Sequence, residues 1–229
     1  MLGIDVHEVD GVTLAVRSWS CYGATWPPVV LLHGTGATAD DWDAIAAQLC
    51  ADRPVFAVDL RGHGESNWPG TYAISQMARD VIGLLPMLSA SEVDLVGHSL
   101  GGLVACQVAA SGRAPVRRLV LEDTGMPHPR PPQTPARPAG PLSFDWAVVE
   151  QVRPEIDEPD SRWPQVMAAI EVPTLAIGGG ASSFVPQEHV EDLAKTVAHG
   201  TRVTIDAGHL VHATKPDAFL ATLTAFLNA

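Results

Sequence analysis

The stretch that decides the fold is residues 93–102, VDLVGHSLGG. An apolar run over residues 93–96 has the composition of a buried strand, and residues 100–110 have that of a buried helix. Between them, residues 97–101 fit the pattern G-x-S-x-G. In this strand–turn–helix context the pattern predicts a tight turn that projects the Ser99 hydroxyl from the sheet edge, with glycines keeping side chains out of the turn. The alternative is a glycine-flanked turn with an incidental serine, which the strand and helix on either side disfavour.

The segments around this turn alternate between strand and helix patterns. Residues 6–9 and 12–19 are short alternating segments joined by Asp10-Gly11, a dipeptide suited to a hairpin turn. Near-continuous apolar strands and amphipathic helices follow, which is typical of a parallel sheet covered on both faces. We therefore predict an α/β protein with a mostly parallel central sheet, an N-terminal antiparallel hairpin and helices on both faces. Further strands are expected at 29–32, 55–58, 93–96, 119–121, 174–177 and 202–205, and helices at 41–50, 74–88, 100–110, 187–197 and 216–227.

A proline-rich segment interrupts this alternation. Seven prolines fall between Pro127 and Pro141, a density incompatible with a regular helix or a central strand. Two short helices are expected after it, at residues 144–152 and 163–170. We predict a single domain over residues 1–229 with a short lid excursion at about 124–172; a disordered surface linker is the alternative interpretation of the prolines.

Composition excludes several classes of partner. The chain has 229 residues, of which 26 are acidic and 14 basic, for a formal charge of −12. Such a charge repels nucleic acid and anionic lipid surfaces, so neither nucleic acid nor a membrane is an expected partner. The three cysteines, Cys21, Cys50 and Cys106, form no C-x-x-C pair, and the N-terminus does not have the pattern of a secretory signal. A cytoplasmic protein with a small-molecule substrate and no metal or organic cofactor is expected; the oligomeric state is left open.

A second glycine-rich bend follows the apolar strand at residues 29–32. It reads His33-Gly34-Thr35-Gly36. Such a bend can direct a backbone amide toward the same point as the amide that follows Ser99. The amides of Thr35 and Leu100 are therefore the predicted pair of oxyanion donors.

Four motifs together resemble the α/β-hydrolase fold superfamily over essentially the whole chain. They are LLHGTG at 31–36, DLRGHGES at 59–66, GHSLGG at 97–102 and AGH at 207–209, and they occur in the family's order. The resemblance implies a structural loop at 59–66, in which His63 has a scaffold role and no catalytic one. It also implies that Ser99 is the nucleophile and that a late histidine is the base.

His209 is the expected base, since the order Ser, acid, His requires a histidine after the last strand. His212 is its rival, only three residues away. The spacing of the two histidines also resembles a metal site, but no third ligand is apparent.

The position of the acidic residue that would pair with the catalytic histidine departs from the commonest family pattern. The family usually carries Gly-x-Asp after the strand at 174–177, whereas Ala181 stands at that position here and the next carboxylate, Glu188, falls inside a helix. Some members of the family that this chain resembles, among them haloalkane dehalogenases of one type, place the acid after the preceding strand instead. That strand ends in Glu122-Asp123.

Because strand side chains alternate, Glu122 and Asp123 cannot both face the histidine. Asp123 is our first assignment and Glu122 the second. A dyad of Ser99 and His209 helped by Ser182 is the third. Asp123 could also be a strand-end aspartate that caps a turn.

These residues predict a serine hydrolase that cleaves an ester, thioester or lactone of a small, partly apolar molecule through an acyl-enzyme on Ser99. The alternatives are a non-hydrolytic enzyme of the same fold, such as a lyase, acyltransferase or cyclase of a biosynthetic pathway, or a binding protein with a vestigial site. Four aromatic residues could line a pocket, although core or lid packing explains each equally well: Trp42, Trp146, Trp163 and Phe184.

Overall fold

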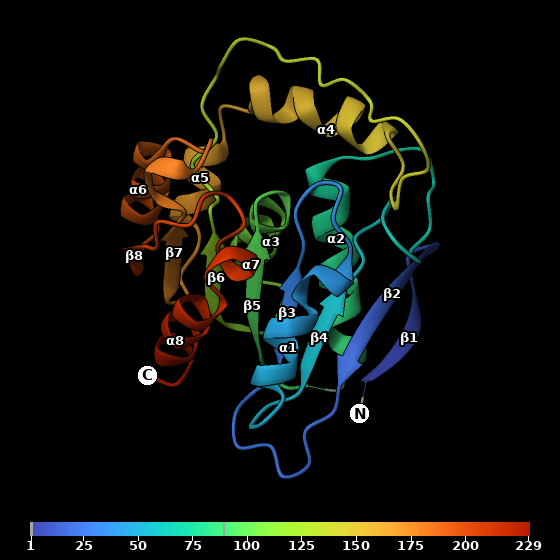
Figure 1. Ribbon diagram of the computed structural model, residues 1–229, viewed down its shortest axis with the longest axis vertical. Coiled ribbons are helices and arrows are strands. Elements are labelled where there is room, and N and C mark those ends of the chain that lie inside the picture. The colour runs from blue at the N-terminus through green and yellow to red at the C-terminus, as the bar shows by residue number, and fades with distance from the viewer. Residues whose placement is uncertain (1, 89) are drawn as a thin grey trace.

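An eight-stranded sheet forms the centre of the molecule in a computed structural model that describes residues 2–88 and 90–229 (Figure 1). The strand order is β1-β2-β4-β3-β5-β6-β7-β8. The strands are β1 (Leu2–Val9), β2 (Val12–Trp19), β3 (Val29–Leu32), β4 (Val55–Val58), β5 (Val93–His98), β6 (Val116–Glu122), β7 (Thr174–Gly178) and β8 (Gly200–Thr204).

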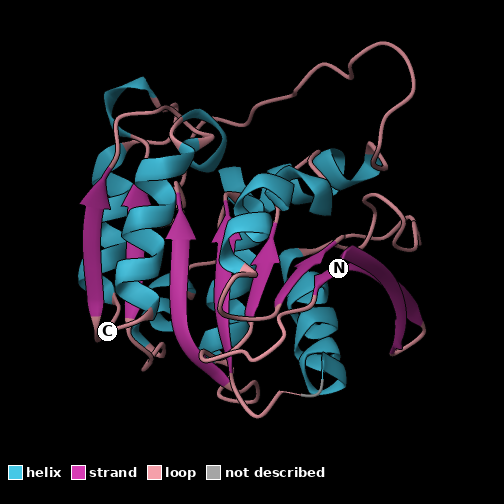
Figure 2. Cartoon of the chain, turned by 60° about the horizontal axis from the view of Figure 1, so that its bottom comes forward, coloured by secondary structure: helices cyan, strands magenta, loops and turns pink. Residues whose placement is uncertain are grey.

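The sheet is antiparallel only at its N-terminal edge. β1 pairs with β2 and β2 with β4 in antiparallel orientation, whereas the pairs from β4 through β3 to β8 are parallel (Figure 2). Asp10 and Gly11 both have positive φ angles, 47° and 80°, as a tight hairpin turn requires. The predicted α/β class, parallel sheet and N-terminal hairpin are confirmed, and the carboxyl ends of six strands consequently meet at one edge.

Helices cover both faces of the sheet, as predicted. The α-helices are α1 (Asp43–Leu49), α2 (Ile74–Leu84), α3 (Leu100–Ala110), α4 (Ala147–Asp157), α5 (Trp163–Ala168), α6 (Gln187–Thr196), α7 (Val211–Thr214) and α8 (Pro216–Leu227). The short 3₁₀ helices are η1 (Ala39–Trp42), η2 (Leu85–Leu88) and η3 (Gly180–Ser182). None of the helices formed by the described residues has the length and apolar character needed to span a bilayer.

Alternating strand residues divide the core into two layers. Leu32 and Leu121 face the cluster that α2, α3 and α6 complete, while their neighbours Leu31 and Val120 face the cluster that α1 and α8 complete. The period-two alternation of a strand thus gives each face of the sheet its own apolar layer.

Several predicted boundaries were wrong. β1 begins at Leu2 rather than residue 6, because its backbone pairs with β2 along the whole length of that strand. α4 begins at Ala147 rather than residue 144, since Asp145 Oδ1 accepts a hydrogen bond from the Ala147 amide (3.0 Å) and fixes the start of the helix. It also continues past Pro154 to Asp157.

The segment between β6 and β7 leaves the sheet at its carboxyl edge. Residues 127–143 contain no helix or strand, and α4 then lies beyond the strand ends, at the top of Figure 1. The Gly64 amide donates to the Ser143 carbonyl (2.8 Å), and residues 63 and 144 form an isolated bridge. These contacts hold the end of the segment against the loop that follows β4, immediately before α4. The single-domain prediction includes Met1 and Ser89, which lie outside the described residues.

Candidate active site

Ser99 occupies a strained turn between β5 and α3. Its φ and ψ angles are 53° and −115°, a combination that L-residues with a Cβ rarely adopt. Two glycines make the turn possible: a Cβ on Gly97 would lie 2.4 Å from the Gly101 carbonyl oxygen, and one on Gly101 would lie 2.4 Å from the Leu32 carbonyl oxygen. The turn therefore holds Ser99 at the start of α3, where the positive end of the helix dipole lies.

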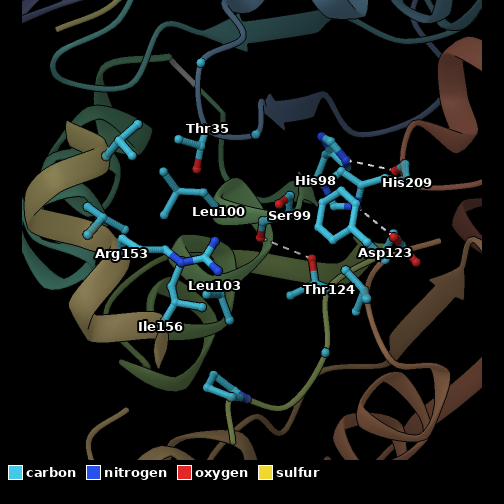
Figure 3. A pocket seen from close by; sticks show the side chains of 18 of the residues that line it. Thr35, His98, Ser99, Leu100, Leu103, Asp123, Thr124, Arg153, Ile156 and His209 are labelled. Atoms are coloured by element: carbon cyan, nitrogen blue, oxygen red, sulfur yellow. Dashed lines mark hydrogen bonds and ion pairs between the residues drawn. The ribbon is translucent and has the colours of Figure 1, made fainter. Parts of the chain in front are cut away.

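The structure brings Asp123 to His209. Asp123 Oδ2 lies 2.7 Å from His209 Nδ1 (Figure 3). Asp123 is fully buried and also accepts hydrogen bonds from the Ser183 hydroxyl and the Gly179 amide. Burial acts to raise the pKa of Asp123, but the hydrogen bonds from His209, Ser183 and Gly179 outweigh it, so this pKa lies below its ordinary value. The carboxylate is therefore ionised at neutral pH and holds the His209 ring from its Nδ1 side.

Glu122 pairs with the other histidine. Its carboxylate accepts hydrogen bonds from the His212 amide and from His212 Nδ1, both at 2.8 Å. His212 Nε2 lies 3.3 Å from Asp41 Oδ2, and the Trp42 ring stacks on the imidazole at 4.3 Å. Burial alone would lower the pKa of His212, but the nearby carboxylates of Asp41 and Glu122 raise it to about 9. His212 is consequently a buried cation at neutral pH.

The bend after β3 is fixed by two buried histidines. The His33 ring bridges the Gly34 carbonyl (2.8 Å) and the Leu60 amide (3.1 Å), while His63 Nε2 accepts from the Gly36 amide (3.3 Å). Burial is the main cause that lowers the pKa of His33 to about 4 and that of His63 to about 3. Both rings are therefore neutral at pH 7, and His63 supports the bend in the scaffold role expected from the sequence.

The amides of Thr35 and Leu100 are both unpaired. Within residues 2–88 and 90–229, no carbonyl or side chain accepts a hydrogen bond from either one. Thr35, Leu100 and Ser99 line the same pocket. Two backbone donors are thus available beside the serine.

That pocket, a cavity of about 770 Å³, lies at the carboxyl edge of the parallel strands. Ser99, Asp123 and His209 all line it (Figure 3). In the described part of the chain no hydrogen bond joins the Ser99 hydroxyl to the His209 ring; such bonds often form only when substrate is bound. Of the four aromatic candidates, Trp146 and Phe184 line the cavity, whereas Trp42 and Trp163 are buried in the core.

Comparison with known families agrees with this architecture. A family model described as "alpha/beta hydrolase fold" matches residues 27–169, more than half of the chain. This chain belongs to the α/β hydrolase fold family.

Among related α/β hydrolases, a "Putative esterase/lipase" of Haemophilus influenzae is 27% identical over 240 residues, covering 88% of this chain and 83% of that protein. "Esterase YbfF" of Escherichia coli is 27% identical over 236 residues, covering 88% of this chain and 93% of its own. The crystal structure of a hydrolase from Pseudomonas aeruginosa PA01 has a TM-score of 0.82 and 26% identity, covering 100% of this chain and 98% of the other. The sequence-based prediction of a hydrolase that acts on ester bonds is confirmed at this level.

Sequence reasoning missed two residues of this α/β hydrolase site, Ser183 and His98. Ser183, not its neighbour Ser182, donates to Asp123; the Ser182 hydroxyl instead lies 3.1 Å from Asp206 Oδ1. His98, the variable residue of the pentapeptide, has its Nε2 3.0 Å from the His209 carbonyl oxygen and so holds the backbone of that residue. Contacts between residues so far apart in the sequence leave no periodic pattern that could predict them. The only sign in the sequence of a role for His98 was its position next to Ser99.

Proposed function

We propose that this α/β hydrolase cleaves an ester, thioester or lactone of a small, partly apolar molecule through an acyl-enzyme on Ser99. The observation that carries the proposal is the 2.7 Å contact between Asp123 and His209 in the pocket that also contains Ser99. Apolar side chains of α3 and α4 line the same cavity, which suits a partly apolar substrate.

In the proposed acylation, His209 Nε2 removes the proton from Ser99 Oγ as that oxygen attacks the substrate's carbonyl carbon. The amides of Thr35 and Leu100 donate to the resulting oxyanion. Asp123 keeps the imidazole in the tautomer with a proton on Nδ1 and stabilises the imidazolium. When the carbon–oxygen or carbon–sulfur bond breaks, His209 returns the proton to the leaving group.

Deacylation repeats these steps with water as the nucleophile. His209 Nε2 takes a proton from the water, whose oxygen attacks the acyl carbon. The acid is then released, and the proton goes back to Ser99 Oγ. Asp123 remains ionised throughout, as its lowered pKa favours.

Ser99→Ala tests this proposal. The unaltered protein should hydrolyse 4-nitrophenyl butyrate and should be labelled by a fluorophosphonate at Ser99, as located by peptide mass spectrometry. Ser99→Ala should lose the label and about 10⁴- to 10⁶-fold in kcat, since the nucleophile is removed while the binding pocket stays.

Ser111→Ala is the matched control, because this serine lies at the opposite end of α3 and bonds to the Val108 carbonyl. It should label and turn over normally. Undiminished hydrolysis by Ser99→Ala would refute the proposal. Labelling of Ser99 without turnover of any simple ester would favour the lyase, acyltransferase or cyclase alternative.

A further inference from the structure

Two arginines line the otherwise largely apolar pocket. Arg130 comes from the proline-rich segment and Arg153 from α4. Figure 3 shows the Arg153 side chain extending from α4 into the pocket, beside Leu103 and Ile156. Because the chain has only 14 basic residues and a net charge of −12, two arginines in one apolar pocket require an explanation.

The Asp157 carboxylate accepts a hydrogen bond from the Nε atom of each arginine. It lies 2.6 Å from Arg130 Nε and 3.0 Å from Arg153 Nε, and it also accepts from the Gln133 amide (2.8 Å). Asp157 is 1% exposed. Burial acts to raise the pKa of Asp157, but the hydrogen bonds from Gln133, Arg130 and Arg153 outweigh it, so its pKa is below the ordinary value. An ionised Asp157 between two arginines leaves one net positive charge.

Three of the four outer nitrogens of these arginines have no hydrogen-bond partner in the described part of the chain. Among the described residues, no group accepts a hydrogen bond from Arg130 Nη1 or Nη2 or from Arg153 Nη1, whereas Arg153 Nη2 donates to Gln133 Oε1. The Arg130 and Arg153 side chains are 35% and 24% exposed, so each is partly accessible to a ligand. Fixing the Nε atoms reduces the rotational freedom that a ligand would otherwise have to remove.

The apolar side chains around Arg130 and Arg153 strengthen the attraction of these arginines for an anion. Val149, Val152 and Ile156 line the pocket beside the arginines, and an apolar environment weakens solvent screening. A guanidinium fork matches the two oxygens of a carboxylate. A single net positive charge suits a monoanion better than a dianionic phosphate.

We propose that Arg130 and Arg153 form a carboxylate-binding subsite, and that the substrate is an ester that carries a free carboxylate as well as the bond to be cleaved. This inference rests on the proposed function, because it assumes that the ester carbonyl lies at Ser99. It narrows the substrate class to half-esters of dicarboxylic acids and similar anionic esters.

Two pairs of substrates test the subsite. In the first, the charge is on the acyl side: 4-nitrophenyl hydrogen adipate against its methyl-capped analogue, 4-nitrophenyl methyl adipate. In the second it is on the alcohol side: 3-carboxyphenyl butyrate against 3-(methoxycarbonyl)phenyl butyrate. The unaltered protein should prefer the charged member of at least one pair in kcat/KM. In Arg130→Gln and in Arg153→Gln that preference should fall about 10- to 100-fold, the loss expected for a hydrogen bond to a charged group.

Arg162→Gln is the matched control. Arg162 precedes α5, its side chain is 80% exposed and pairs with Asp160, and it does not line the pocket. It removes the same charge and should leave the preference between the two esters unchanged. A ratio that does not change in Arg130→Gln or Arg153→Gln, with both esters slowed equally, would mean that the arginines only fasten the proline-rich segment to α4, and would overturn the inference.

The outcomes separate this inference from the proposed function. Hydrolysis of both members of each pair without preference overturns the subsite and leaves the serine hydrolase intact. If no ester is hydrolysed, the proposed function fails, and binding of monomethyl adipate to Ser99→Ala, measured by calorimetry, still decides on the subsite. The subsite is supported if monomethyl adipate binds at least tenfold more tightly than dimethyl adipate and if this difference is lost when Arg130→Gln is added. Equal binding of the two compounds overturns the subsite.

Discussion

Two carboxylate–histidine pairs lie side by side at the end of β6, and they differ in what surrounds them. Asp123 bonds to His209, whose side chain is 17% exposed and lines the pocket. Glu122 bonds to His212, which is 2% exposed. The two acids are adjacent in the sequence and the two histidines are three residues apart. The sequence alone therefore gives little basis for deciding which acid pairs with which histidine.

The difference lies in the second ring nitrogen. His209 Nε2 has no hydrogen-bond partner among the described residues, whereas His212 Nε2 lies 3.3 Å from the carboxylate of Asp41. A ring held by carboxylates on both sides keeps its proton, and the pKa of His212 is accordingly raised to about 9. Only the pair with a free nitrogen facing a cavity can exchange protons with a substrate, which teaches that a carboxylate–histidine contact alone does not define an acid–base site.

Replacing each acid by its amide should give the largest difference in kcat between the two pairs. Asp123→Asn should lower kcat for 4-nitrophenyl butyrate by about 10⁴-fold, because an amide no longer orients His209 or stabilises its charged form. Glu122→Gln should lower kcat per folded molecule by less than about tenfold. Circular dichroism checks folding, and an equal loss in the two variants would remove the distinction between the pairs.

Disrupting the Glu122–His212 pair should lower the stability of the protein. His212→Gln removes the cation between Glu122 and Asp41 and leaves a buried carboxylate without its ion partner, which costs about 3 to 5 kcal/mol. Urea denaturation followed by fluorescence measures the change in the free energy of unfolding. Leu220→Ala, at a partly buried position of α8 without charge, is a control for ordinary packing loss. A His212→Gln protein as stable as the unaltered one would show that the buried ion pair adds no net stability.

The pH dependence of stability should follow His212 as well. Its pKa of about 9 in the folded state is above the ordinary value near 6.5, so the folded protein binds this proton more tightly than the unfolded chain. The stabilisation, about 3 kcal/mol at most, is therefore complete below about pH 6.5 and is lost as pH rises through 9. The stability difference between the unaltered protein and His212→Gln should shrink over this interval in urea titrations; a difference that is constant with pH would contradict the assignment.

The smallest expected contrast concerns two adjacent serines. Ser183→Ala removes one of the hydrogen bonds that fix Asp123 and should lower kcat about 5- to 10-fold, the value of one such bond. Ser182→Ala loses only a bond to Asp206 and should change kcat less than twofold. Esterase assays on the two variants make the comparison, and a greater loss for Ser182→Ala would reverse the roles that their contacts suggest.

Much of the fold could be predicted from local patterns. The strand–turn–helix pattern around Ser99 and the alternation of strands and helices led to the correct fold class, because turn sterics and side-chain periodicity act over a few residues. Helix ends were less accurate: α4 extends from Ala147 to Asp157, and its start is set by a hydrogen bond from the Ala147 amide to the side chain of Asp145.

What the sequence by itself determined is therefore the α/β architecture, the turn at Ser99 and the short set of acids and histidines from which a site could be built. Only the tertiary structure decided that Asp123 meets His209, that Glu122 meets His212, and that Arg130 and Arg153 share Asp157 in the pocket. The physical reason is distance along the chain. Asp123 and His209 are separated by 86 residues, and which side of the sheet each loop reaches depends on the packing of all the strands and helices between them.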